Sequence, residues 1–151
     1  MKYLTNEVAN SSRAEWDRAC MRLCRAFRRI EKYFSSEFSK CFLEGDFHDS
    51  SIIEILFCCA QSNTADLHLK MQDGYENEIC HYLTLKNVTN VKLNTDLCSD
   101  WLYAEILPVT NEKYVEGKRF SLEVTFPNDK SLYLHFGRIE YYRKKNNSPS
   151  P

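Results

Sequence analysis

The amino-acid sequence predicts an α+β fold: an N-terminal amphipathic helix and a short second helix pack on a mainly antiparallel sheet of about six strands. Up to residue 43, apolar residues recur every three or four positions, which is the period of a helix with one buried face. From residue 47 onward, apolar and polar residues alternate, which is the period of a half-buried strand. Because 43% of the 151 residues are hydrophobic, the chain has enough apolar material for one packed core.

The first helix is predicted over residues 12–34. Ser12 and Glu15 have the spacing of a capping box, in which each side chain accepts a hydrogen bond from a free backbone amide of the first turn. One face is apolar and is formed by Trp16, Ala19, Cys20, Leu23, Phe27, Ile30 and Phe34. A second face carries a row of cations, here called the basic stripe, at Arg18, Arg22, Arg25, Arg29 and Lys32. The second helix is predicted over residues 36–43 and ends at Gly45, so the helical layer covers residues 12–43.

The sheet is predicted over residues 47–142. The apolar run at residues 52–60 is typical of a buried strand, and alternation predicts further strands at residues 67–71, 81–86, 88–93 and 101–107. The clearest hairpin joins residues 120–126 to residues 132–136 through a turn at Pro127 and Asn128. Residues 143–151 are polar and contain Pro and Ser, so a disordered tail is predicted after a single domain at residues 1–142.

The N-terminus and the cysteines indicate a reducing compartment. The first seven residues lack the apolar run of a secretory signal, and no stretch approaches the roughly 20 apolar residues of a membrane span. The seven cysteines are odd in number, and Cys58 lies next to Cys59, which suits reduced thiols better than a disulfide framework. We therefore expect a cytoplasmic protein without a membrane segment.

Charge is divided unevenly along the chain. Residues 1–45 contain nine Lys or Arg and six Asp or Glu, whereas residues 46–142 contain eight and fifteen. An acidic surface with embedded aromatic rings suits a basic protein partner, because the rings anchor the partner and the carboxylates steer its approach. The sequence therefore predicts a partner-binding surface made of Trp101, Tyr103, Glu105, Glu112 and Glu116. The alternative is that both rings belong to the core and the acids are solvated.

One enzyme hypothesis remains, although the sequence contains no nucleophile elbow, phosphate-binding Gly loop or paired-His motif. A small-ligand binder or hydrolase-type enzyme could use His48 and Asp49, together with His81 or His135. Such a site requires at least two of these groups to converge in one concave pocket. We favour a structural role for the pair, in which His48 or Asp49 bonds the backbone where the helical layer leads into the sheet.

Metal and nucleic-acid binding are both disfavoured. Cys20 and Cys24, or Cys80 and His81, lack the two close ligand pairs of a structural zinc site, so neither a metal nor a cofactor is predicted. The basic stripe has no adjacent aromatic platform of the kind that nucleic-acid grooves use. It is better explained as a solvated helix face or as an ion-pair partner of the acidic sheet.

Three fragments resemble an uncharacterised family of small bacterial proteins. They are the opening residues 1–5, the segment from Phe47, His48 and Asp49 to Ile52, and the segment from Trp101 and Tyr103 to Ile106. The family carries Leu-His-Asp at the start of its first strand, where this chain has Phe47, and a later Trp-Leu-Tyr-x-Glu segment. Its N-terminal helical region is longer than the one in this chain.

The family has no established activity that the resemblance could imply. Similar His-Asp patterns also occur in bacterial immunity proteins, which neutralise a toxin by binding it. Together with the acidic half of the chain, this analogy leads to one hypothesis. The protein would be a non-enzymatic protein-binding module, of the kind that inhibits a bacterial toxin domain. The sequence does not indicate an oligomeric state.

Overall fold

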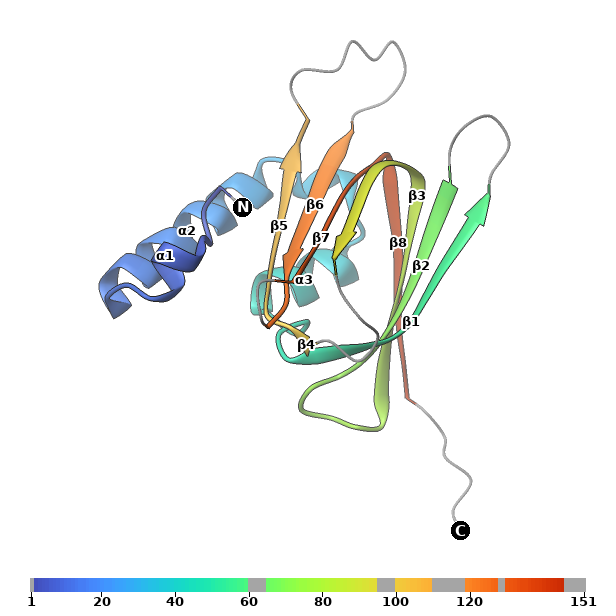
Figure 1. Ribbon diagram of the computed structural model, residues 1–151, viewed down its shortest axis with the longest axis horizontal. Coiled ribbons are helices and arrows are strands. Elements are labelled where there is room, and N and C mark those ends of the chain that lie inside the picture. The colour runs from blue at the N-terminus through green and yellow to red at the C-terminus, as the bar shows by residue number, and fades with distance from the viewer. Residues whose placement is uncertain (1, 60–64, 95–99, 110–118, 128–129, 146–151) are drawn as a thin grey trace.

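The computed structural model describes residues 2–59, 65–94, 100–109, 119–127 and 130–145 (Figure 1). Its helices are α1 (Asn6–Ala9), α2 (Arg13–Arg28) and α3 (Ser36–Glu44), with a 3-10 turn η1 (Glu31–Tyr33). Its strands are β1 (Ser50–Cys59), β2 (Ala65–Gln72), β3 (Ile79–Asn94), β4 (Asp100–Trp101), β5 (Tyr103–Pro108), β6 (Phe120–Thr125), β7 (Ser131–Phe136) and β8 (Arg138–Lys145). The predicted α+β class is confirmed. In the described part of the chain the sheet has eight strands rather than about six.

Helix α2 begins where the sequence predicts but ends at Arg28 rather than at residue 34. Both hydrogen bonds of the capping box between Ser12 and Glu15 are present. After Arg28, the amides of Arg29 and Ile30 bond to carbonyls three residues back, which tightens the chain and turns it. The turn brings the ring of Phe34 to within 5.4 Å of the ring of Phe27. In a straight helix, residues seven positions apart are separated by about 10 Å along the axis.

The sheet curls back on itself. Its strands follow the order β4-β1-β2-β3-β7-β6-β5, with antiparallel pairing, and β8 pairs with β3. The ends of this path, β4 and β5, are separated in the chain by Leu102 alone. The two ends of the sheet therefore meet, and the curvature is visible in Figure 1.

The strands predicted at residues 81–86 and 88–93 form one bent strand, β3. Asn87 and Asn90 lie at the bend and have φ angles of 56° and 55°, a left-handed conformation that Asn adopts more readily than most residues. The bend allows β3 to pair first with β8 and then with β7, which are separated by Gly137. Because β8 continues to Lys145, residues 143–145 belong to the sheet, and the predicted disordered tail is wrong there. Residues 146–151 lie outside the described residues.

Strand β1 differs from its prediction as a buried strand. Ile52 is fully buried, but the residues after it are half-buried or exposed. The reason is its position in the sheet: after Ser51 no described strand covers its second edge.

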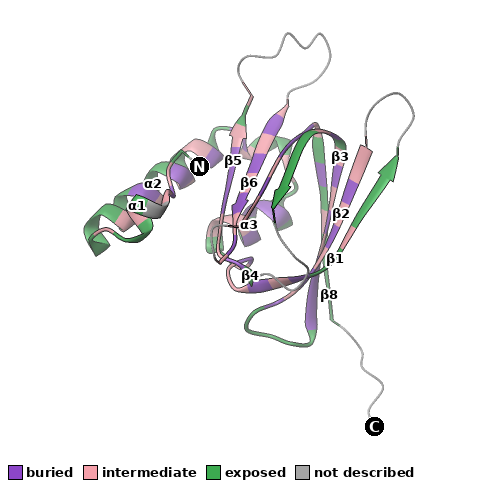
Figure 2. Ribbon diagram, viewed as in Figure 1, coloured by how far each residue is buried: buried purple, intermediate pink, exposed green. Residues whose placement is uncertain are grey.

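Apolar side chains form two clusters. The larger cluster lies between the sheet and the segment from the end of α2 through α3, and includes Phe27, Phe38 and Phe136. The smaller cluster contains Leu4 and Leu23, with Trp16, Cys20 and Tyr103 among the side chains packed against it. Figure 2 shows buried positions along α2 and along most strands, so α2 belongs to both clusters. No helix in the described ranges is long and apolar enough to cross a membrane.

Candidate functional site

An apolar pocket of about 190 Å³ opens where α2, α3, the turn before β1 and the β4–β5 junction meet. We call it the junction pocket. The side chains that define it are Trp16, Cys20, Phe47, His48, Trp101 and Tyr103. The structure thus brings together three residues that the sequence singled out for different reasons: Trp101 and Tyr103 for partner binding, and His48 for a possible enzyme site.

Local structure places the floor of the junction pocket. Gly45 ends α3 in the left-handed conformation, with φ of 80°, and this turn sends Phe47 under the sheet. The amide of Asp49 donates to the carbonyl of Trp101 (2.8 Å), which ties the turn to β4. Phe47 and Trp101 are both buried, with ring centroids 5.8 Å apart, and so close the pocket from below.

The walls of the junction pocket are half-buried rings. Trp16 of α2 packs on Tyr103 of β5 with ring centroids 4.8 Å apart, and His48 lies 5.8 Å from the same tyrosine ring. Cys20, one turn after Trp16, also lines the pocket. Sequence reasoning did not assign Trp16 to a site, because its place on the apolar helix face made it a core residue.

His48 and Asp49 bond to each other rather than to a further catalytic group. His48 Nδ1 lies 2.9 Å from Asp49 Oδ2, and the same oxygen accepts a hydrogen bond from the Tyr75 hydroxyl (3.3 Å). Asp49 has a φ of 62°, so the pair stabilises a tight turn between the helical layer and β1. His81 and His135 bond elsewhere, to Asp73 and to the Tyr133 hydroxyl. His48 and Asp49 do lie within hydrogen-bond distance of each other, but of the four residues His48 alone lines the junction pocket, so the junction pocket does not bring two of these groups together.

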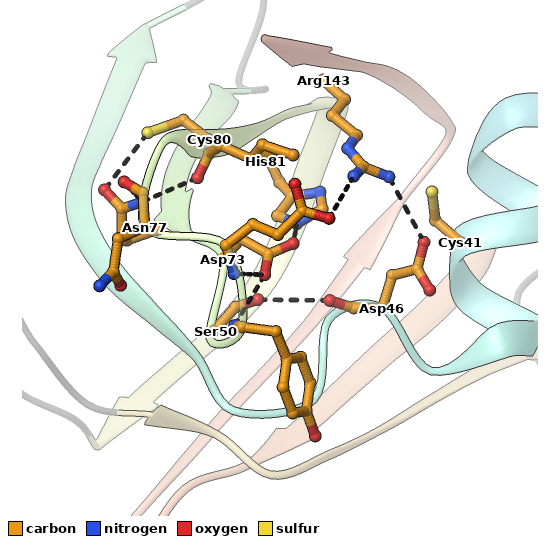
Figure 3. Close-up of polar contacts among 12 residues, drawn as sticks. Cys41, Asp46, Ser50, Asp73, Asn77, Cys80, His81 and Arg143 are labelled. Carbon is orange, nitrogen blue, oxygen red and sulfur yellow. Dashed lines mark hydrogen bonds and ion pairs between the residues drawn. The ribbon is translucent and has the colours of Figure 1, made fainter. Parts of the chain in front are cut away.

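A second polar group resembles a nucleophile with its base and acid, and Figure 3 shows three of its four members, Cys41, Asp73 and His81. Asp73 Oδ2 lies 2.9 Å from His81 Nε2, His81 Nδ1 lies 2.9 Å from the Tyr141 hydroxyl, and that hydroxyl lies 3.2 Å from Cys41 Sγ. We call these four residues the buried relay. Arg143 lies beside it and contacts the carboxylates of Asp46 (3.9 Å) and Glu76 (3.7 Å).

Burial and protonation make the buried relay structural. Burial raises the pKa of the Cys41 thiol and also that of the Tyr141 hydroxyl, so both groups keep their protons. The Tyr141 hydroxyl lies within hydrogen-bond distance of both His81 Nδ1 and Cys41 Sγ, and His81 Nε2 lies within hydrogen-bond distance of the Asp73 carboxylate. His81 is 0% exposed, which leaves no access for a substrate. The relay thus connects α3, the β2–β3 turn, β3 and β8.

Asp73 is the carboxylate of the buried relay and bonds to His81. Burial alone raises the pKa of this carboxyl, but hydrogen bonds from the amides of Glu76 and Tyr75 and from His81 outweigh it and lower the pKa below its ordinary value. Asp73 Oδ1 accepts from both amides at 2.8 Å. The carboxylate therefore stabilises the β2–β3 turn as well as the histidine.

The described part of the chain contains three of the five residues of the predicted acidic surface. Glu105 is 2% exposed, and its two oxygens accept hydrogen bonds from the amides of Lys2 (2.7 Å), Tyr3 (2.6 Å) and Leu4 (2.6 Å). Trp101 forms the pocket floor, and Tyr103 remains half-buried in the pocket wall. Glu112 and Glu116 lie outside the described residues. Alternation in β5 turns Glu105 away from the main core, but the N-terminal segment covers it there.

The basic stripe begins on an exposed face of α2 and continues past the end of that helix with Arg29 and Lys32. In the described structure, Arg18, Arg22, Arg25 and Arg29 form no ion pair with a carboxylate, whereas Arg13 pairs with Asp17 (3.7 Å). The stripe is therefore not the ion-pair partner of the acidic sheet that the sequence suggested. Arg18 and Arg22 also line a hollow of about 480 Å³ between α1 and α2.

Comparison with protein-family models, with curated proteins and with solved structures finds no significant match to this chain. In the described part, no group of three His, Cys, Asp or Glu side chains is arranged to hold a metal ion. Function must therefore be argued from the geometry.

Proposed function

We propose that this protein is a non-enzymatic binding module for another protein, and that the junction pocket receives an apolar side chain of that partner. The observation that carries the proposal is the pocket itself: half-buried aromatic and thiol side chains from separate elements surround a hollow with an apolar floor. Aromatic-lined hollows of this kind are where partner anchor residues bind in protein interfaces.

The size of the junction pocket favours a single side chain over a whole ligand. Pockets for small molecules and cofactors have volumes of about 300–1,000 Å³, and the junction pocket has about 190 Å³. His48 supplies a polar group at the wall, because its Nδ1 bonds to Asp49 and its Nε2 has no hydrogen-bond partner among the described residues. That nitrogen can bond the partner's backbone next to the anchor and so add specificity.

Filling the junction pocket is expected to abolish partner binding without unfolding the protein. Cys20→Phe places a ring inside the pocket, whereas Met21→Phe places the same ring on the exposed side of α2, where Met21 is 52% exposed. Peptides selected from a random phage-displayed library on the wild-type chain should share one large apolar residue. They should bind Cys20→Phe at least about tenfold more weakly and Met21→Phe with unchanged affinity. Equal binding to all three proteins would disprove the pocket assignment.

The partner class that we propose is a bacterial toxin domain. Support comes from the resemblance of the His48–Asp49 region to immunity proteins, together with a pocket suited to one anchor residue. The pocket variants supply the second measurement. If a toxin gene lies beside this gene, cells that express that toxin should survive with the wild-type chain or Met21→Phe, and die with Cys20→Phe. If cells survive equally well with Cys20→Phe and Met21→Phe, the junction pocket takes no part in binding the toxin.

A second candidate function is polyanion binding by the basic stripe, and the unpaired arginines favour it. If four stripe residues contact phosphates of a single-stranded nucleic acid, the logarithm of the binding constant should fall linearly with the logarithm of the salt concentration, with a slope of about −3. Reversing Arg22 and Arg25 to Glu should make this slope shallower by about 1.4, while Arg13→Glu, off the stripe, should leave it unchanged. A fluorescent single-stranded RNA that shows no anisotropy change at low salt would exclude this function.

A further inference from the structure

The outer edge of β1 is open. One edge of this strand pairs with β2 from Ser51 to Cys59, but on the other edge β4 pairs only with Ser50 and Ser51. In the described ranges, the backbone of residues 53–59 therefore has no strand partner on that side. Figure 1 shows β1 at the margin of the sheet.

This edge lacks the features that normally prevent two sheets from pairing. Edge strands are usually protected by Lys, Pro, bulges or inward charges. Residues 53–59 contain neither Lys nor Pro, and Glu54 is their single charged residue. The irregularity in the β1–β2 pairing lies at Ile53, so the strand after it is regular. Leu56 is 51% exposed and Phe57 is 44% exposed, which adds apolar surface beside the free backbone.

We propose that β1 pairs antiparallel with β1 of a second copy of this chain, so that the two sheets become continuous across a twofold axis at Leu56. In this register Leu56 faces its own copy, Ile55 faces Phe57, and Glu54 faces Cys58. Residues that face each other across an antiparallel pair lie on the same side of the sheet. Apolar residues therefore meet apolar residues, and the two glutamates are not opposed.

The second copy is favoured over an unrelated strand because β1 complements itself. A twofold contact uses the same patch on both chains, and the sequence of β1 meets that condition without placing like charges together. A net charge of −1 on each chain opposes association only weakly. The contact is a single strand pair, smaller than the 1,200–2,000 Å² or so of a stable interface. We therefore expect a reversible dimer with a dissociation constant of about 10–100 μM.

Sedimentation equilibrium of the full chain from about 1 to 500 μM tests the association. The wild-type chain should follow a monomer–dimer equilibrium, and Leu56→Lys should raise the dissociation constant at least about 30-fold, because it places two cations side by side at the axis. Met21→Lys, a matched change at a 52% exposed residue of α2, should leave the equilibrium unchanged. Circular dichroism should show both variants folded.

Disulfide trapping tests the register. In a background with Cys58→Ser and Cys59→Ser, the added change Leu56→Cys should give a disulfide-linked dimer under mild oxidation. Facing Cα atoms in an antiparallel pair are about 4.5–5.5 Å apart, within the range of a disulfide. Glu54→Cys in the same background should not link to itself, and the background alone should not link.

Several outcomes would overturn the proposal. They are a chain that stays monomeric at 500 μM, a dimer that Leu56→Lys does not weaken, and linkage through Glu54→Cys but not through Leu56→Cys. Added peptides that pair with β1 of a monomeric chain would show a different occupant and would equally reject the second copy. The junction pocket takes no part in these measurements, so the result is independent of the proposed function.

Discussion

Replacing Glu105 with alanine is expected to lower the free energy of unfolding by about 3 kcal/mol and to detach residues 2–4 from the sheet. The carboxylate is buried and accepts hydrogen bonds from three consecutive amides. Each bond to a charged group contributes about 1.5–3 kcal/mol. The expected loss is smaller than the sum of three such bonds, because hydrogen bonds that share one carboxylate do not contribute additively. It also includes Leu4, which leaves the smaller apolar cluster.

The variant Glu105→Gln keeps the shape of the side chain that binds residues 2–4 and removes its charge. The amide side chain can still accept from Tyr3 and Leu4, but its nitrogen cannot accept from Lys2, so a loss of about 1–2 kcal/mol is expected. Urea denaturation gives these free energies, and hydrogen exchange at the amides of Tyr3 and Leu4 reports detachment. Glu140→Gln, at an exposed position of β8, serves as the control. If both amides stay protected in Glu105→Ala, the N-terminal segment is held by other contacts.

Replacing His81 with alanine is expected to lower the free energy of unfolding by about 3–5 kcal/mol. This is the largest effect expected from replacing any histidine of the described structure. The substitution removes a fully buried ring and leaves the carboxylate of Asp73, which is itself buried, without its histidine partner. It also removes the imidazole to which the Tyr141 hydroxyl bonds. Tyr141→Phe, which removes only that hydroxyl, should cost about 1–2 kcal/mol. His68→Ala, at a half-buried position bonded to Thr84, should cost about 1 kcal/mol or less.

The free energy of unfolding, measured as a function of pH in the acidic range, gives a second test of the buried relay. Because the pKa of Asp73 is lowered in the folded protein, its contribution is complete above the unfolded value of about 3.9. The contribution is lost as pH falls from there through the lowered folded value. Asp73→Asn should therefore be less stable than the wild type at pH 6, and this difference should shrink below about pH 4. A difference that stays constant down to pH 3 would show that the carboxylate charge does not stabilise the fold.

Local patterns predicted a large part of the architecture. The capping box at Ser12, the alternation in β2 and β6, and the apolar helix face as far as Phe27 involve neighbouring residues, and the structure has each of them. The predicted continuation of that face to Phe34 lies beyond the end of α2 at Arg28. The strand count failed at two places. The sequence predicts one strand over residues 101–107, but Leu102 separates β4, which pairs with β1, from β5, which pairs with β6. The sequence analysis does not predict β8, which follows β7 after Gly137 and continues along the same partner, β3. Most residues of β8 are half-buried or exposed, so no apolar alternation marks it as a strand.

The sequence predicts the candidate sites less well than it predicts the fold. The apolar run that became β1 has the composition of a buried strand, but burial depends on whether another strand covers its edge. Glu105 has the composition of a solvated acid, but its environment is formed by residues about a hundred positions away in the chain. His48, Tyr103 and Trp16 meet through three separate elements, and no local spacing relates them.

By itself, the sequence determined the α+β class, the positions of its two main helices and the alternation of its strands. These depend on the backbone geometry and on the solvation of residues within one or two turns of each other. Only the tertiary structure decided that Glu105 anchors the N-terminal segment, that Trp101 closes a pocket and that, among the described strands, none covers the outer edge of β1 after Ser51. Each of these depends on which distant segments pack together, because that packing sets whether a polar or apolar group meets water, a partner or another copy.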